Sequence, residues 1–252
     1  MADPFESPNA LLARAAHHIN ELESEIIRFG REGRRTPFTE RDAPTGDILF
    51  KLRFDDRVTH LPCIVFDAVS CLRSSLDHVV YGAAALITAL PEPGGTKFPF
   101  GDNAKQARND FVRKGPPPGL DPLQDFIIDK IQPYQGGGGE ALWRLNKARN
   151  TKIHRILAPV AIRQKGSLVT GRGVHMTNAR PVHHWDSEKQ ELTHYRVTTF
   201  EGEPEFNLTL GIAFVEGSNL PKGTVVAGLR ELAAEVAKAV ADVASEAGKI
   251  AR

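Results

Sequence analysis

The order in which residue patterns change along the chain constrains its fold most. Apolar side chains recur at helical spacing over residues 11–26 and 62–90, and again over 222–249. Residues 48–54 alternate between the two faces of a strand, and residues 160–215 carry short alternating runs rich in Val and Thr. Helices, then strands, then a helix predict an α+β fold with an N-terminal helical bundle, an antiparallel sheet and a closing C-terminal helix.

The same patterns suggest how the chain is organised. We expect residues 1–158 to form the bundle, with one early strand and long loops, and residues 159–252 to form the sheet and the last helix, packed on the bundle as one unit. Shorter helices are predicted over 103–114, 122–131 and 140–157, with Gly- and Pro-rich loops at 115–119 and 136–139. The Arg-rich segment from Arg28 to Arg41 is predicted to continue from the first helix into a loop.

Composition excludes several classes of protein. A hydrophobic content of 41% and a charged content of 25% are typical of a globular chain, and no apolar run approaches the roughly 20 residues that span a bilayer. The N-terminus lacks the apolar segment of a signal peptide. Cys63 and Cys71 lie eight residues apart on one predicted helix, about 12 Å along its axis, which is too far for a disulfide. We therefore expect free thiols, a cytoplasmic location and no membrane association.

Acidic residues are absent from residues 141–185, so the net charge of +1 conceals a strongly cationic segment. A cationic surface favours anionic partners, and RNA or another polyanion is the partner we expect. The basic residues of this segment are Arg144, Lys147, Arg149, Lys152, Arg155, Arg163, Lys165, Arg172 and Arg180.

Arg149 falls in the middle of the apolar arc of the predicted helix 140–157, and Asn146, Asn150 and His154 follow the edge of that arc. Burying a guanidinium without a partner is costly. Arg149 must therefore either pair with a carboxylate inside the protein or face a wet cleft. In the second case it could hold a phosphate beside a titratable histidine.

A second Arg-to-His spacing occurs in the predicted helix 62–90. Arg73 and Asp77 flank its core stripe at i,i+4 spacing, and Asp77 is the leading candidate to neutralise Arg149 or Arg73. His78 lies on the opposite side, on a face of small residues that either packs closely on another helix or leaves room for a ligand. We expect close packing and a satisfied interior histidine. The small residues of that face are Cys71, Ser74, Ser75 and Gly82.

The segment Leu72 to His78 resembles the "LRSxLDH" helix of a group of uncharacterised bacterial proteins. Phe98-Pro99-Phe100, Gln132-Pro133-Tyr134, and Asn150 with His154-Arg155 match further places in that group. Lys152 departs from the pattern, because it lies two residues before His154 and not directly before it. The resemblance covers roughly residues 52–157 and implies an architecture without an established activity.

Arg149-Asn150-x-x-x-His154 also resembles the Arg-polar-x-x-x-His motif of HEPN domains, which are helical bundles. Many HEPN domains are metal-independent ribonucleases that act as dimers. The resemblance implies that His154 is the acid/base, that Arg149 contacts the phosphate and that Asn150 orients one of them. The strand-rich region from Val160 onward is not part of a minimal HEPN bundle.

The ribonuclease hypothesis needs neither a cofactor nor a metal, because RNA carries its own nucleophile, the 2′-OH. One histidine cannot serve both proton transfers. A homodimer with two copies of His154 would supply the second, as would His78 from the same chain. The residues expected to bind substrate, with Trp143 as the stacking partner, are Arg73, Asp77, Arg144, Lys147, Lys152, Arg155 and Trp143.

Two other functions stay open from the sequence. One is a non-catalytic binding or interaction protein, in which the Gly136–Gly139 run either forms a plain loop or cradles an anion on its N–H groups. The other is a metal-dependent helical-bundle hydrolase that uses His18 and Glu25 with Asp77 or His78 and His154. No Lys-Ser/Thr pair follows the glycines at P-loop spacing, which argues against a nucleoside triphosphatase.

Overall fold

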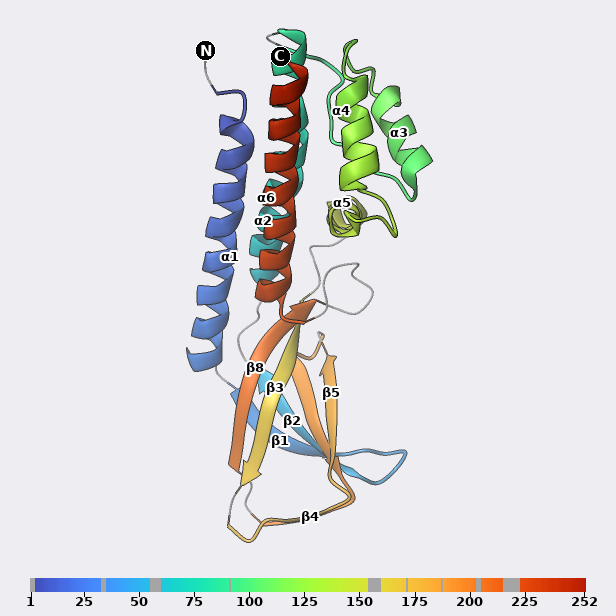
Figure 1. Ribbon diagram of the computed structural model, residues 1–252. Coiled ribbons are helices and arrows are strands. Elements are labelled where there is room, and N and C mark those ends of the chain that lie inside the picture. The colour runs from blue at the N-terminus through green and yellow to red at the C-terminus, as the bar shows by residue number, and fades with distance from the viewer. Residues whose placement is uncertain are drawn as a thin grey trace.

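Three long helices stand side by side above a small antiparallel β-region, and shorter helices pack beside the upper half (Figure 1). The computed structural model describes residues 3–32, 35–54, 60–90, 92–153, 160–170, 172–186, 188–202, 205–214 and 223–252. Within these ranges the side chains of 151–153, 160–170, 205–211 and 214 are not described. The arrangement confirms the predicted α+β fold.

The long helices are α1 (Glu6–Glu32), α2 (Leu61–Thr88) and α6 (Val225–Ile250). Proline in the first turn of α2 and the Thr224 side chain, which accepts a hydrogen bond from the Ala227 amide, fix two of the starts. Their apolar stripes face one another, as helical periodicity predicts. The resulting core extends to buried aromatic residues outside the bundle, such as Phe98.

The shorter helices are α3 (Ala104–Arg113), α4 (Asp121–Phe126), a π-helical turn η1 (Ile127–Ile131) and α5 (Glu140–Ile153). Asn103 caps α3 by accepting a hydrogen bond from the Gln106 amide. The predicted helix 122–131 therefore exists, but its second half widens into a π turn. The predicted end of α5 at residue 157 lies outside the described residues.

Within the described residues, the β-region contains one four-stranded sheet and two strand pairs, all antiparallel. The order in the sheet is β1-β2-β6-β5, and the pairs are β3-β8 and β4-β7. The strands are β1 (Arg35–Arg41), β2 (Ile48–Phe54), β3 (Val160–Thr170), β4 (His175–Thr177), β5 (Arg180–Asp186), β6 (Glu191–Val197), β7 (Thr199–Glu201) and β8 (Glu205–Phe214).

Strand β1 corrects one prediction, because its residues were expected to form a basic loop. It lies at the edge of the sheet with nearly all its side chains exposed, so it shows no alternation of apolar and polar residues. The sheet joins two strands from residues before 158 with two from after it, and α6 packs against α1 and α2. The two predicted ranges are thus interleaved in space, and the boundary between them lies outside the described residues.

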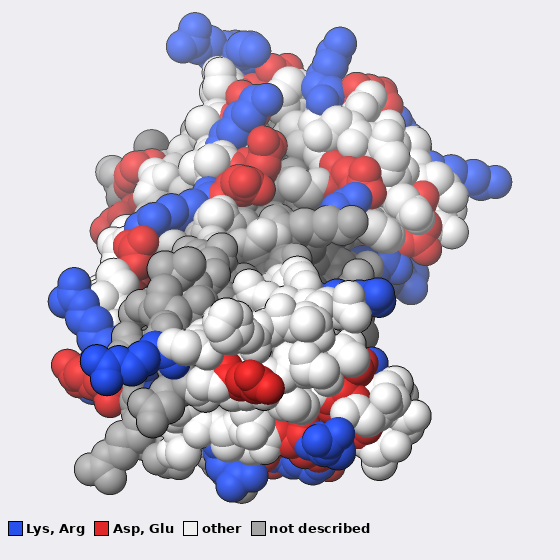
Figure 2. All heavy atoms as spheres, turned by 90° about the horizontal axis from the view of Figure 1, so that it is seen from below, with Lys and Arg blue, Asp and Glu red and all other residues white. Residues whose placement is uncertain are grey.

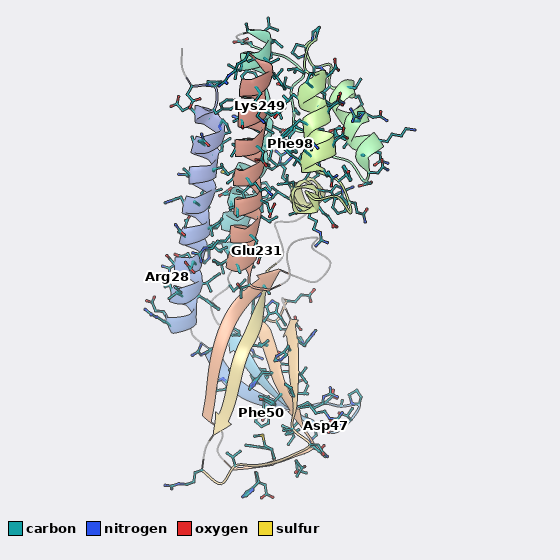
Figure 3. The ribbon with its side chains drawn as sticks, in the orientation of Figure 1. Arg28, Asp47, Phe50, Phe98, Glu231 and Lys249 are labelled. Carbon is teal, nitrogen blue, oxygen red and sulfur yellow. The ribbon has the colours of Figure 1, made fainter. Side chains whose placement is uncertain are left out.

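Most buried apolar residues belong to the helical half, where Phe98 lies, whereas Phe50 lies in the sheet half (Figure 3). A second, small cluster joins Leu52, Phe54 and Leu192 in the sheet. The helical half is therefore the rigid support for any site built on α2 and α5. Among the described helices, none combines the length and apolar character that crossing a bilayer requires.

Candidate functional site

Arg73 is buried between α2 and α5, and Asp77 neutralises it. One guanidinium nitrogen lies 2.7 Å from Asp77 Oδ1, and the Arg73 side chain is only 7% exposed. Its Nε donates to Asn146 Oδ1 at 2.9 Å, and its guanidinium carbon lies 4.5 Å from the centre of the Phe100 ring. Asp77 Oδ1 also accepts a hydrogen bond from the Phe98 amide at 2.9 Å. The prediction that Asp77 neutralises one of the two arginines is confirmed, and that arginine is Arg73.

Arg149 lies on α5 in a different situation. The residue is half-buried, and its Nε is shielded from solvent without a hydrogen-bond partner among the described residues. Within the same part of the chain, no carboxylate forms an ion pair with Arg149. The sequence left two alternatives for Arg149, an ion pair inside the protein or a wet cleft. The described residues supply no such ion pair.

A cavity of about 340 Å³ opens beside Arg73, between α3, α5 and the loop that precedes α3. Its wall combines aromatic rings, side-chain amides and charged groups of both signs, namely Phe100, Asp102, Gln106, Asn109, Asp110, Arg113, Trp143, Asn146 and Lys147. Trp143 and Lys147 were predicted to bind substrate. The cavity joins them to Phe100, which was noted only as part of a turn, and to Gln106 and Asn109, which no sequence pattern singled out. These residues lie more than thirty positions before α5, so only the tertiary fold brings them together.

Asp102 holds the aromatic and basic side chains of this wall in place. Lys147 Nζ lies 2.9 Å from Asp102 Oδ1, and Trp143 Nε1 donates to the same oxygen at 3.1 Å. The hydrogen bond from Lys147, followed by that from Trp143, lowers the pKa of Asp102 below its ordinary value. Lys147 also lies 5.4 Å from the centre of the Trp143 ring. The cavity is thus lined by an ordered, ionised cluster.

Two of the remaining predicted residues, Arg144 and Asn150, have described side chains on α5. Arg144 forms an exposed i,i+4 ion pair with Glu140 at 3.1 Å, a type of pair that contributes little stability. Asn150 Nδ2 donates to Asn146 Oδ1 at 3.3 Å, so Asn150 extends the network that begins at Arg73. The side chain of Lys152 is not described, and His154 and Arg155 lie outside the described residues.

His78 faces α1, whereas Arg73 faces α5. The expectation of an interior histidine is wrong, because His78 is exposed and its Nδ1 lies 2.7 Å from Ser7 Oγ. The close packing predicted for the small-residue face is confirmed at two points. Ser75 Oγ donates to the Pro8 carbonyl at 2.9 Å, and a Cβ at Gly82 would lie 2.2 Å from the Pro4 carbonyl oxygen. The chain entering α1 therefore lies directly against α2.

The residues proposed for a metal-dependent hydrolase have other contacts. His18 Nδ1 lies 3.2 Å from Glu21 Oε2, and Glu25 contacts Arg28 and His60. Asp77 pairs with Arg73. In the part of the chain that the structure describes, no three His, Cys, Asp or Glu side chains are grouped to hold a metal ion.

The Gly136–Gly139 run forms a tight loop whose amides are used internally. The amides of Gly137, Gly138 and Gly139 donate to the Tyr134 carbonyl, the Gln132 side chain and the Gln132 carbonyl. A Cβ at Gly137 or Gly139 would lie 2.5 Å from a backbone oxygen of the 131–132 segment, so close approach explains these two glycines. The loop interpretation is therefore favoured over an anion cradle.

Charges of both signs are mixed on the face of the molecule seen from the sheet end. In Figure 2, Lys and Arg side chains lie beside Asp and Glu side chains over the described part of this face. The described surface in this view shows no large patch of one sign, so local geometry around α5 carries the argument for an anion site.

Comparisons of the chain with protein-family models, curated proteins and solved structures found no match.

Proposed function

We propose that the protein binds single-stranded RNA along α5, with Arg149 as the contact to a phosphate. The observation that carries this proposal is the half-buried guanidinium of Arg149, which has no ion pair among the described residues. A guanidinium partly removed from water is stabilised by an anion, and its planar donors match a phosphate. RNA supplies such anions at every nucleotide.

The cavity beside α5 suits the base of a bound nucleotide. Trp143 offers a ring, and the amides of Gln106, Asn109 and Asn146 offer donors and acceptors for a base edge. Trp143 precedes Arg149 by six residues, which is about 9 Å along the helix. One nucleotide would place its base in the cavity while a neighbouring phosphate reaches round α5 to Arg149, which is not among the residues that line the cavity.

RNA cleavage is the second candidate. Two residues of the HEPN-like motif favour it. Arg149 has no ion pair within the described chain, and Asn150 is hydrogen-bonded to Asn146. Trp143, Lys147 and Asn150 share one face of α5, and the same spacing next reaches His154. His154 would then transfer the proton of the RNA 2′-OH, with a second copy of His154 from a homodimer as its partner.

Binding is tested with a fluorescently labelled oligoribonucleotide and anisotropy measurements. Arg149→Gln should weaken binding about tenfold, the loss expected for one charge-assisted contact. It should also reduce the slope of log K against log salt by about one. Arg28→Gln removes the same charge from an exposed position on α1, on the other side of the bundle from α5 (Figures 1 and 3), and should bind like the parent protein. Equal weakening in both variants would reject a specific role for Arg149.

Cleavage is tested with the same RNA in the presence of EDTA. Metal-independent cleavage that disappears in His154→Ala, with binding retained, would support the endoribonuclease. Cleavage that persists in this variant would reject the assignment of His154. Binding without cleavage in the parent protein would leave a non-catalytic RNA-binding protein.

A further inference from the structure

A second cavity, which shares no lining residue with the cavity at α5, lies where the start of α1 meets α2. It has a volume of about 860 Å³ and is bounded by the start of α1, the middle of α2 and the segment around Lys97. Ser7 and His78 both lie on its wall, and their side chains are 2.7 Å apart. The proposed RNA site uses neither residue, since it lies on α5.

We propose that Ser7 and His78 form the nucleophile and general base of an acyl-ester hydrolase site. A serine hydroxyl is a weak nucleophile unless an adjacent base removes its proton, and an imidazole within hydrogen-bond distance is such a base. The geometry requires the tautomer with the ring proton on Nε2, so that Ser7 Oγ donates to an unprotonated Nδ1. Ser7 lies in the first turn of α1 and is exposed, so an ester can reach it.

The packing of the start of α1 on α2 fixes the positions of the Ser7 and His78 side chains. The chain entering α1 is fixed on α2 by the bond from Ser75 Oγ to the Pro8 carbonyl and by the close approach of Pro4 to Gly82. His78 follows Ser75 by three residues and therefore lies one helical turn further along the same side of α2. The contact between Ser7 and His78 thus rests on two neighbouring contacts between the same segments, one on each side of it along α2.

The other groups on the cavity wall suit an ester with an apolar acyl group. Tyr81, Ala10 and Pro4 provide apolar surface, and Lys97 provides positive charge for the oxygen that becomes anionic. Asp77 also lines this cavity, but it pairs with Arg73 and accepts from the Phe98 amide. Asp3 and Glu6 also line the cavity, but within the described residues no carboxylate is hydrogen-bonded to His78, so the arrangement is a dyad.

The reaction conserves atoms and protons. Ser7 Oγ bonds to the ester carbonyl carbon while His78 Nδ1 takes the hydroxyl proton, and the bond from that carbon to the alcohol oxygen then breaks. The departing alcohol takes the proton from His78. Water next attacks the acyl-serine, with its proton passing to His78 and then to Ser7 Oγ. The products are a carboxylic acid and an alcohol, and water is the only co-reactant.

The test uses the full chain with a fluorophosphonate probe, which bonds to activated serines, and peptide mass spectrometry to locate the label. Ser7 should be labelled, and His78→Gln should slow this labelling by about a hundredfold, the lower range for loss of a general base. Hydrolysis of p-nitrophenyl butyrate should fall in parallel in His78→Gln and disappear in Ser7→Ala. Absence of label on Ser7, or labelling unaffected by His78→Gln, would overturn the proposal.

Two matched variants control this experiment. Ser24→Ala removes another exposed serine of α1, and His17→Gln removes another exposed histidine, so both should keep the labelling and hydrolysis of the parent protein. Thermal unfolding of Ser7→Ala and His78→Gln should match the parent, which separates loss of chemistry from loss of fold. RNA binding should be unchanged in all four variants, because α5 is untouched. Hydrolysis that survives Ser7→Ala would place the activity elsewhere and reject the dyad.

Discussion

Arg73 and Arg149 are both partly removed from water at the helices α2 and α5, yet their surroundings differ. Arg73 meets Asp77, Asn146 and the ring of Phe100, so its charge is compensated inside the protein. Arg149 meets no carboxylate among the described residues. A buried charge that is compensated internally belongs to the scaffold, whereas one that is not compensated is suited to a ligand. We therefore expect substitution at Arg73 to lower the stability of the protein and substitution at Arg149 to lower its affinity for a ligand.

Asp77→Ala should cause the largest loss of stability. It leaves the buried guanidinium of Arg73 without its counter-charge and the Phe98 amide without its acceptor, and we expect a loss of about 3 kcal/mol. Urea denaturation measures this loss. Glu23→Ala serves as the control, because its ion pair with Arg230 is exposed and should contribute less than about 1 kcal/mol. Equal losses in the two variants would show that Asp77 does not support a buried charge.

His194 is a third buried side chain that can carry a positive charge, and burial favours its neutral form. It lies fully buried in β6, and burial, with a smaller effect of His183, lowers its pKa to about 4. In the unfolded chain its pKa is about 6.5. As the pH falls from 6.5 to 4 the unfolded state takes up the proton first, so stability decreases across this window and His194 causes no further loss below it.

We expect His194 to lower the free energy of unfolding by about 3 kcal/mol as the pH falls from 7 to 4. Urea denaturation of the parent protein and of His194→Phe at several pH values measures it, because the groups common to both proteins cancel in the difference. The stability of His194→Phe should vary less with pH over this window. His17→Gln, at an exposed position, should keep the full dependence. Parallel curves for the parent and His194→Phe would mean that His194 has the same pKa in the folded and unfolded protein.

The sequence predicted the local features of these regions. Helical periodicity located the long helices, and the i,i+4 spacing of Arg73 and Asp77 correctly suggested their pairing. The cavity at α5 could not be predicted, because Asp102 and Trp143 are far apart in the chain and no periodic pattern links a loop to a helix face. The contact of Ser7 with His78 was equally hidden, since it joins positions 71 residues apart. The π turn at η1 follows from no propensity that we can identify.

The cluster around Asp102 provides a smaller test of the α5 site. Asp102→Asn keeps the shape of the side chain but removes the charge that holds Lys147 and orders Trp143. If the cavity accepts a base stacked near Trp143, loss of this order should weaken RNA binding by a few-fold. The substitution also removes the repulsion between the Asp102 carboxylate and the RNA phosphates, which acts in the opposite direction. Anisotropy measures the net change, and Trp143→Ala sets its expected upper limit. Tighter binding in Asp102→Asn would show that repulsion outweighs positioning.

Arg149→Gln should have the smallest effect on stability and so completes the comparison with Arg73. Because the described residues provide no ion pair to break, its removal should change the free energy of unfolding by less than about 1 kcal/mol. Arg73→Gln, in contrast, leaves Asp77 without its partner and should destabilise the protein clearly. Urea denaturation without RNA separates the two cases. If Arg149→Gln unfolded as readily as Arg73→Gln, Arg149 would belong to the scaffold, and an unpaired charge on α5 could no longer support RNA binding.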